Sequence, residues 1–64
     1  MKMYIARNKD NKLYLYPNRP EKEDYYGMWQ GEEGQIPDSP LFSDIFWEDN
    51  NPVEVEVNIT IENV

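Results

Sequence analysis

The last part of the chain carries an unbroken alternation of apolar and polar residues. Its apolar members are all β-branched: Val53, Val55, Val57, Ile59 and Ile61. Its polar members are Glu54, Glu56, Asn58, Thr60 and Glu62. Because successive side chains of a strand point to opposite faces, a period of two predicts a β-strand with one face on a core and the other in water. The alternation runs for about nine or ten residues, roughly 30 Å at ~3.3 Å per residue.

The beginning of the chain has the pattern of a β-hairpin. Residues 3–7 and 12–16 have strand composition, and residues 8–11 between them are all turn-forming or polar. Within the second strand, leucines and tyrosines alternate, so that the leucines lie on one face and the tyrosines on the other. Since both faces are then partly apolar, we expect each of them to be covered by another part of the chain.

The middle of the chain predicts a second, shorter hairpin. Residues 25–30 have strand composition, although Gly27 inside them is typical of a bulge or a close approach of another backbone. A turn at residues 31–34 precedes a short return strand at residues 35–36.

A single helical turn is expected near residues 40–46. Ser39 has the chemistry of a helix N-cap, and Pro40 suits the first helical position. Seven residues are too few for an independent helix, so we expect Phe42 and Ile45 to hold this turn against the core.

These patterns predict one domain, residues 1–64, with a mainly β fold and a small α+β fold as the alternative. The expected architecture is one twisted antiparallel sheet of roughly four to five strands with the single helical turn near residues 40–46. A chain of 64 residues buries only ~60% of the surface that its unfolded form exposes. With no cysteine for disulfides, the nine aromatic residues must supply much of the core, and a homodimer would add more burial.

The formal net charge is −7, and its two signs are separated along the chain. All six basic residues lie in the first 22 positions, where only Asp10 and Glu21 are acidic. From Glu23 to Val64 there are eleven acidic residues and no basic one. Because nucleic acids and anionic membranes attract basic surfaces, we expect neither of them as a direct partner.

Most catalytic and metal-binding chemistry lacks the residues it needs. Without histidine or cysteine there is no Ser-His-Asp triad, no Cys-His pair and no zinc site of the usual kinds. Paired carboxylates remain, but so small a domain has little volume for the cleft that they require. Asp44, Glu48 and Asp49 offer oxygen ligands without the loop spacing of an EF-hand, and a solvated acidic loop is expected there. We therefore expect a protein that is not an enzyme, with no cofactor and no metal.

Residues 3–16 read MYIARNKDNKLYLY, and residues 42–49 read FSDIFWED before Pro52 and the Val/Glu alternation. These two stretches resemble short uncharacterised proteins of gut bacteria, their phages and other mobile elements. In that group an Ile-Ala-Arg strand precedes a tight turn and a Leu-Tyr-Leu-Tyr strand; here Asn11 stands where glycine is more usual. The similarity touches about half of the chain. It implies an accessory or host-manipulating role and transfers no functional residue.

The sequence thus predicts a small acidic protein-interaction module in the cytoplasm. As a phage or mobile-element accessory protein it would bind a basic host protein, with carboxylates standing in for the phosphates of DNA. The candidate contact residues are Glu32, Glu33, Asp38, Asp44, Glu48, Asp49, Glu54 and Glu56. One alternative is a structural unit that forms a homo-oligomer through its C-terminal strand. Another is that the acidity only keeps a small β protein in solution.

Overall fold

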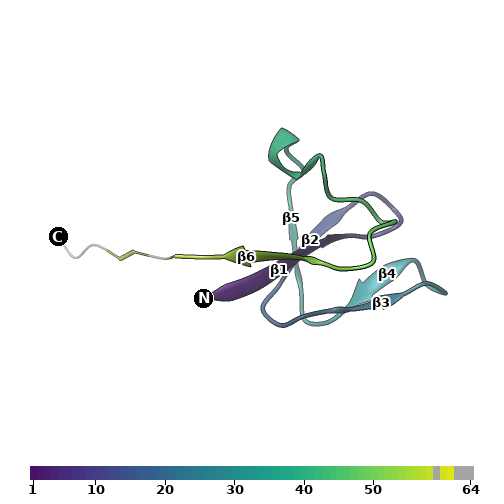
Figure 1. Ribbon diagram of the computed structural model, residues 1–64, viewed down its shortest axis with the longest axis horizontal. Helices are drawn as coiled ribbons and strands as arrows, with labels where there is room; N and C mark the ends of the chain where they lie inside the picture. The colour runs from purple at the N-terminus through teal and green to yellow at the C-terminus, as the bar shows by residue number, and fades with distance from the viewer. Residues whose placement is uncertain (59, 62–64) are drawn as a thin grey trace.

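The computed structural model describes residues 1–58, 60 and 61, which form a mainly β protein with one short helical turn (Figure 1). The strands in chain order are β1 (Lys2–Arg7), β2 (Leu13–Tyr16), β3 (Glu21–Glu23), β4 (Met28–Gln30), β5 (Gly34–Ile36) and β6 (Val53–Glu56). The helical turn is the 3-10 helix η1 (Pro40–Phe42). The mainly β fold predicted from the sequence is confirmed, and Ser39 caps η1 as expected, its Oγ accepting from the Leu41 N–H.

The main sheet has four antiparallel strands in the order β5-β2-β1-β6. β1 and β2 form the predicted hairpin, with Ile5 opposite Leu15 and Tyr4 opposite Tyr16. The turn between them has Asn11 at φ +75°, a conformation that asparagine tolerates better than most residues other than glycine. The departure from glycine at this position is therefore compatible with a tight turn.

Both faces of the main sheet are covered, as the alternation of leucine and tyrosine predicts. What we call the aliphatic face carries Ile5, Leu13, Leu15 and Val55, and Ile45 and Phe42 pack against it from the segment after β5. The opposite, aromatic face carries Tyr4, Ala6, Tyr14 and Tyr16, and Trp29 and Trp47 pack against it. The predicted packing of Phe42 and Ile45 is confirmed, although the helical turn that holds them ends at Phe42.

The prediction of one sheet is wrong, because β4 pairs with β3 and forms a separate two-stranded sheet. The predicted hairpin of residues 25–30 with residues 35–36 does not form: β5 pairs with β2 instead. Gly27 has φ +67° and turns the chain between β3 and β4, so that the polar segment Glu21–Glu23 becomes the partner of β4. The small sheet can then lie over the aromatic face, where Trp29 is buried.

The predicted C-terminal strand is correct only in its first part. β6 ends at Glu56, and the described residues beyond it form no strand, while Ile59 and Glu62 lie outside the described residues. The bound matches the register with β1: Lys2, the first residue of β1, pairs with Glu56, and Val57 donates its N–H to the carbonyl of Met1. Beyond β6 the chain runs away from the body of the protein, and Ile61 is 82% exposed (Figure 1).

Arg7 joins the aliphatic face to the segment that covers it. Its side chain is buried beside Ile45, whose carbonyl accepts from Nε at 2.6 Å. The guanidinium also donates to the carbonyls of Asn11 and Phe42 and to both carboxylate oxygens of Asp38. A buried charge is tolerated when its hydrogen-bond donors all have acceptors. Here the hydrogen bonds of the guanidinium also hold the segment from Asp38 to Ile45 on the sheet.

Candidate protein-binding site

The acidic residues suggested by the sequence do not gather on one surface. Glu32 and Glu33 lie between β4 and β5, and Glu54 and Glu56 lie on β6. The other four follow β5 or η1 in the long connection to β6; they are Asp38, Asp44, Glu48 and Asp49. The candidate set is thus spread over several loops and one strand.

Several of these carboxylates already have partners within the chain. Arg7 hydrogen-bonds Asp38 and thereby lowers the pKa of that carboxyl, with a smaller contribution from the Ser39 N–H. Glu54 forms an ion pair with Lys2 at 3.3 Å, and Glu56 accepts from the amino group of Met1 at 2.7 Å. These contacts leave less free negative charge than the sequence alone suggests.

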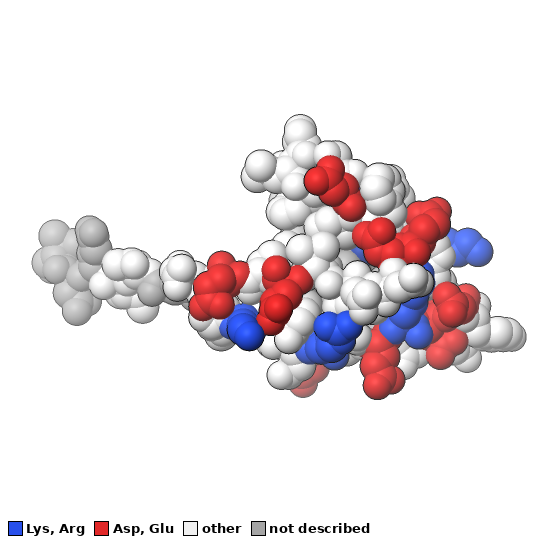
Figure 2. Space-filling view, viewed as in Figure 1, with Lys and Arg blue, Asp and Glu red and all other residues white. Residues whose placement is uncertain are grey.

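The separation of charge along the sequence disappears in space. β1, from the basic part of the chain, pairs directly with the acidic strand β6. Figure 2 shows Lys and Arg side chains interspersed among Asp and Glu on the face in view. A sheet that pairs the first strand with the last brings the two ends of the sequence together, so the run of acidic residues does not become a uniformly acidic face.

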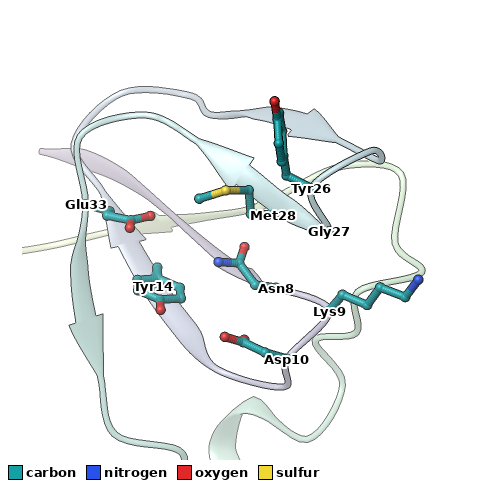
Figure 3. Close-up of a pocket in the computed structure, with 8 residues that line it drawn as sticks. All are labelled: Asn8, Lys9, Asp10, Tyr14, Tyr26, Gly27, Met28 and Glu33. Carbon is teal, nitrogen blue, oxygen red and sulfur yellow. The ribbon is translucent and has the colours of Figure 1, made fainter.

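A more localised feature is an open pocket of about 470 Å³ beside the aromatic face (Figure 3). The turn after β1 and the connection from β3 to β4 line it, together with β2 and the approach to β5. Its lining residues are Asn8, Lys9, Asp10, Tyr14, Tyr26, Gly27, Met28 and Glu33.

Asp10 and Glu33 place two carboxylates at this pocket, on either side of Tyr14 in the view of Figure 3. Asp10 is held by the hairpin turn, because its Oδ1 accepts from the N–H of Lys12 at 3.0 Å. The ammonium of Lys9 points away from the pocket (Figure 3). The pocket therefore combines an aromatic wall with negative charge at its rim.

Asn8 lies at the back of the pocket and is only 5% exposed. Its Oδ1 accepts from the backbone N–H of Trp29 at 2.8 Å, which ties the main sheet to β4. No hydrogen bond among the described residues uses its Nδ2, which points toward the space between Tyr14 and Glu33 (Figure 3). An amide whose NH2 group faces a pocket and has no partner within the chain is suited to donate to a carbonyl of a bound molecule.

Hydrogen bonds join the small sheet to the main sheet around the pocket. The hydroxyl of Tyr16 donates to the Trp29 carbonyl at 3.0 Å, and Lys9 donates its N–H to the Gly27 carbonyl at 2.9 Å. Burial raises the pKa of Tyr16 well above its usual range, and the nearby Glu33 carboxylate raises it further. Tyr16 thus remains protonated at neutral pH and acts as a structural donor, not as an acid or base.

Lys22 has its own aromatic environment on the small sheet. Its ammonium lies 4.4 Å from the centre of the Trp47 ring and 5.8 Å from that of Trp29, and it donates to the Asp49 carbonyl. These contacts secure the loop that contains Trp47, and they show that this fold accommodates a cation between aromatic rings.

Sequence reasoning named only one residue of this pocket, Glu33. The sequence places Asp10 in a turn and Tyr14 on one face of a strand, and the structure has both there. No local pattern indicates that Tyr26, Gly27, Met28 and Glu33 approach them from other segments and complete the pocket.

Comparison with known proteins gives no family for the chain: it matches no protein-family model, no curated protein and no solved structure. Among residues 1–58, 60 and 61, no helix has the length and apolar character needed to cross a membrane. Within the same residues, no three acidic side chains gather in a way that would hold a metal ion, and the chain has no His or Cys to join them.

Proposed function

We propose that the protein is a non-enzymatic binding module that receives an arginine or lysine side chain of a basic protein partner in the pocket beside Tyr14. The observation that carries the proposal is the placement of Asp10 and Glu33 at the rim of an aromatic-lined pocket. A guanidinium stacks favourably on a tyrosine ring and pairs with carboxylates at its edges.

Three further lining residues have a part in this proposal. Tyr14 supplies the surface on which the cation lies, and Met28 supplies an adaptable apolar contact for the aliphatic stem of the side chain. The free Nδ2 of Asn8 donates to a backbone carbonyl of the bound segment. The pocket therefore favours a peptide over an isolated cation, because a peptide supplies both a charged side chain and a main-chain carbonyl.

The basic partner, the cytoplasmic location and the role as a phage or mobile-element accessory belong to the same proposal. The net charge of −7 favours encounter with a basic protein through long-range attraction. In this view the scattered acids serve attraction and solubility, whereas Asp10 and Glu33 serve recognition. The partner's specificity then depends on the pocket rather than on a mimic of DNA.

A peptide titration tests the proposal. A short arginine-rich peptide is added to isotopically labelled protein, and the side-chain amide signals of Asn8 and the backbone signals around the pocket are followed by NMR. We expect these signals to shift first, and a peptide with citrulline in place of arginine to shift them far less, because citrulline has no charge.

Paired variants distinguish the pocket from general acidity. The D10N/E33Q double variant removes both rim charges, while Asn at position 10 can still accept from Lys12. We expect the affinity for the arginine peptide to fall about 2- to 30-fold, as for the loss of two partly exposed ion pairs. The control D44N/E48Q removes equal charge outside the pocket and should have less than about a 2-fold effect. An equal loss in both variants would contradict the proposal.

A further inference from the structure

The outer edge of β6 is open along a strand with strong β-forming residues. β6 is an end strand of the main sheet, paired with β1 on one side only. Proteins normally shield such an edge because its free N–H and C=O groups can pair with another chain. Val53 is 37% exposed and Ile61 82%, so the apolar side of this segment is also incompletely covered.

The register with β1 fixes which backbone groups face outward. Val57 donates to the Met1 carbonyl at 2.8 Å and accepts from the Met1 amino group at 3.2 Å, so Val57 points its N–H and C=O toward β1. With the alternation of an antiparallel ladder, Val53 and Val55 do the same. The free backbone groups at the edge therefore belong to Glu54, Glu56 and Asn58.

We infer that this edge pairs with β6 of a second copy of the chain, antiparallel, with the two-fold axis at Val57. The choice of register rests on charge. A pairing centred on Val55 places Glu54 opposite Glu56 of the other copy, and one centred on Glu56 places Glu56 opposite itself. Like charges directly opposite one another are unfavourable in a sheet.

Centring the pair on Val57 removes both conflicts. Glu56 then faces Asn58 of the second copy, and Glu54 faces Thr60, so no carboxylate of the described residues faces another. On the other side of the ribbon, Val57 faces Val57, and Val53 faces Ile61. The alternation of apolar and polar residues is thus complementary to itself in this register.

The shape of the molecule leaves room for this arrangement. The described residues beyond β6 run away from the body (Figure 1), so an antiparallel partner lies along them with its own body displaced toward their far end. The two main sheets would join into one sheet across the axis. In this pairing the described residues beyond β6, which form no strand in the single chain, would gain a strand partner.

Cysteine cross-linking tests the register, since the chain has no native cysteine. Val57 would form a non-hydrogen-bonded pair with its own copy, in which Cα atoms lie ~4.5 Å apart and a disulfide fits well. We expect V57C to cross-link at least about ten-fold faster than V55C, or than Q35C on the exposed edge strand β5. Equal rates for V57C and V55C would overturn the register.

Charge variants and sedimentation test the dimer itself. T60K places a lysine opposite Glu54 of the second copy twice per dimer, so we expect dimerisation to tighten about 2- to 30-fold. Q35K makes the same change in charge on β5 and should leave dimerisation unchanged. A wild-type chain that stays monomeric at millimolar concentration would overturn the inference. The inference would also be overturned if the Glu54 and Glu56 amides were protected from hydrogen exchange only after a valine-rich peptide is added to the protein. The edge would then bind a different partner.

Discussion

Tyr16 contributes both its ring and its hydroxyl to the packing between the two sheets. The side chain has no exposed surface, and its hydroxyl donates to the Trp29 carbonyl of β4. Because burial raises the pKa of Tyr16, the folded protein keeps this proton at pH values where the unfolded chain loses it, above ~10. The stabilisation is therefore complete below pH ~10 and declines as the pH rises beyond it.

We predict that Y16F lowers the free energy of unfolding by about 0.5–1.5 kcal/mol at neutral pH, through loss of the hydroxyl hydrogen bond. The difference from wild type should narrow above pH ~10, where only the wild type has this tyrosine to ionise on unfolding. Urea unfolding at several pH values measures it. Y25F is the control, since Tyr25 is 86% exposed and loss of its hydroxyl should change the free energy of unfolding at neutral pH by less than about 0.5 kcal/mol.

At the scale of elements, the hairpin of β3 and β4 depends on the conformation of Gly27. Its φ is +67°, and a Cβ added there would lie 2.9 Å from the Cβ of Lys9, on the neighbouring turn of the main sheet. The close approach also lets Lys9 donate to the Gly27 carbonyl. This one residue thus sets both the reversal of the chain and the distance between the small sheet and the first hairpin.

We predict that G27A destabilises the protein by about 2 kcal/mol or more, because alanine is strained at this φ and its methyl group meets Lys9. The matched control is G34A in β5, where an added Cβ has no neighbour within 4 Å. There we expect no loss of stability, or a gain of up to ~1 kcal/mol from a less flexible unfolded chain. Chemical denaturation of both variants gives the comparison, and equal destabilisation would contradict it.

The elements differ in how much of their structure the sequence could reveal. The hairpin of β1 and β2 follows from local turn chemistry and alternation, and Ser39 with Pro40 indicates where η1 begins. The pairing of β4 with β3, and of β5 with β2, depends on Gly27 and on contacts between distant segments. The end of β6 at Glu56 depends on where β1 begins, which the alternation itself does not reveal. The pocket was missed for the same reason, since it lies between segments that local patterns do not connect.

The molecule as a whole consists of two cores that share the main sheet. Arg7 secures the cover of the aliphatic face, and Asn8, its neighbour, secures the cover of the aromatic face through Trp29. Adjacent residues at the end of β1 thereby hold opposite layers of the protein. Different segments cover the two faces of the main sheet. Local unfolding of one segment can therefore be measured separately from local unfolding of the other.

We predict that R7K loosens the segment that covers the aliphatic face more than the small sheet. A lysine cannot make the several directed hydrogen bonds of the guanidinium. Hydrogen exchange should quicken at the amides of Ser43 and Ile45, which are bonded within that segment, more than at the Trp29 amide. R19K is the control, because Arg19 is exposed and its guanidinium makes one hydrogen bond among the described residues, to Asn51. An equal increase in exchange rate at all three amides would contradict this prediction, because it would show that the two covering segments unfold together.

The position of β1 between two covered faces has a consequence for how this protein can evolve. Tyr4 and Ala6 project into one core, while Ile5 and Arg7 project toward the other, so no run of alternate positions on β1 is left to solvent. In β6 every second residue is a glutamate on the surface, and such positions can drift. Substitutions should therefore accumulate unevenly between two strands that lie side by side, and β1 is where relatives of this chain would keep the same residues longest.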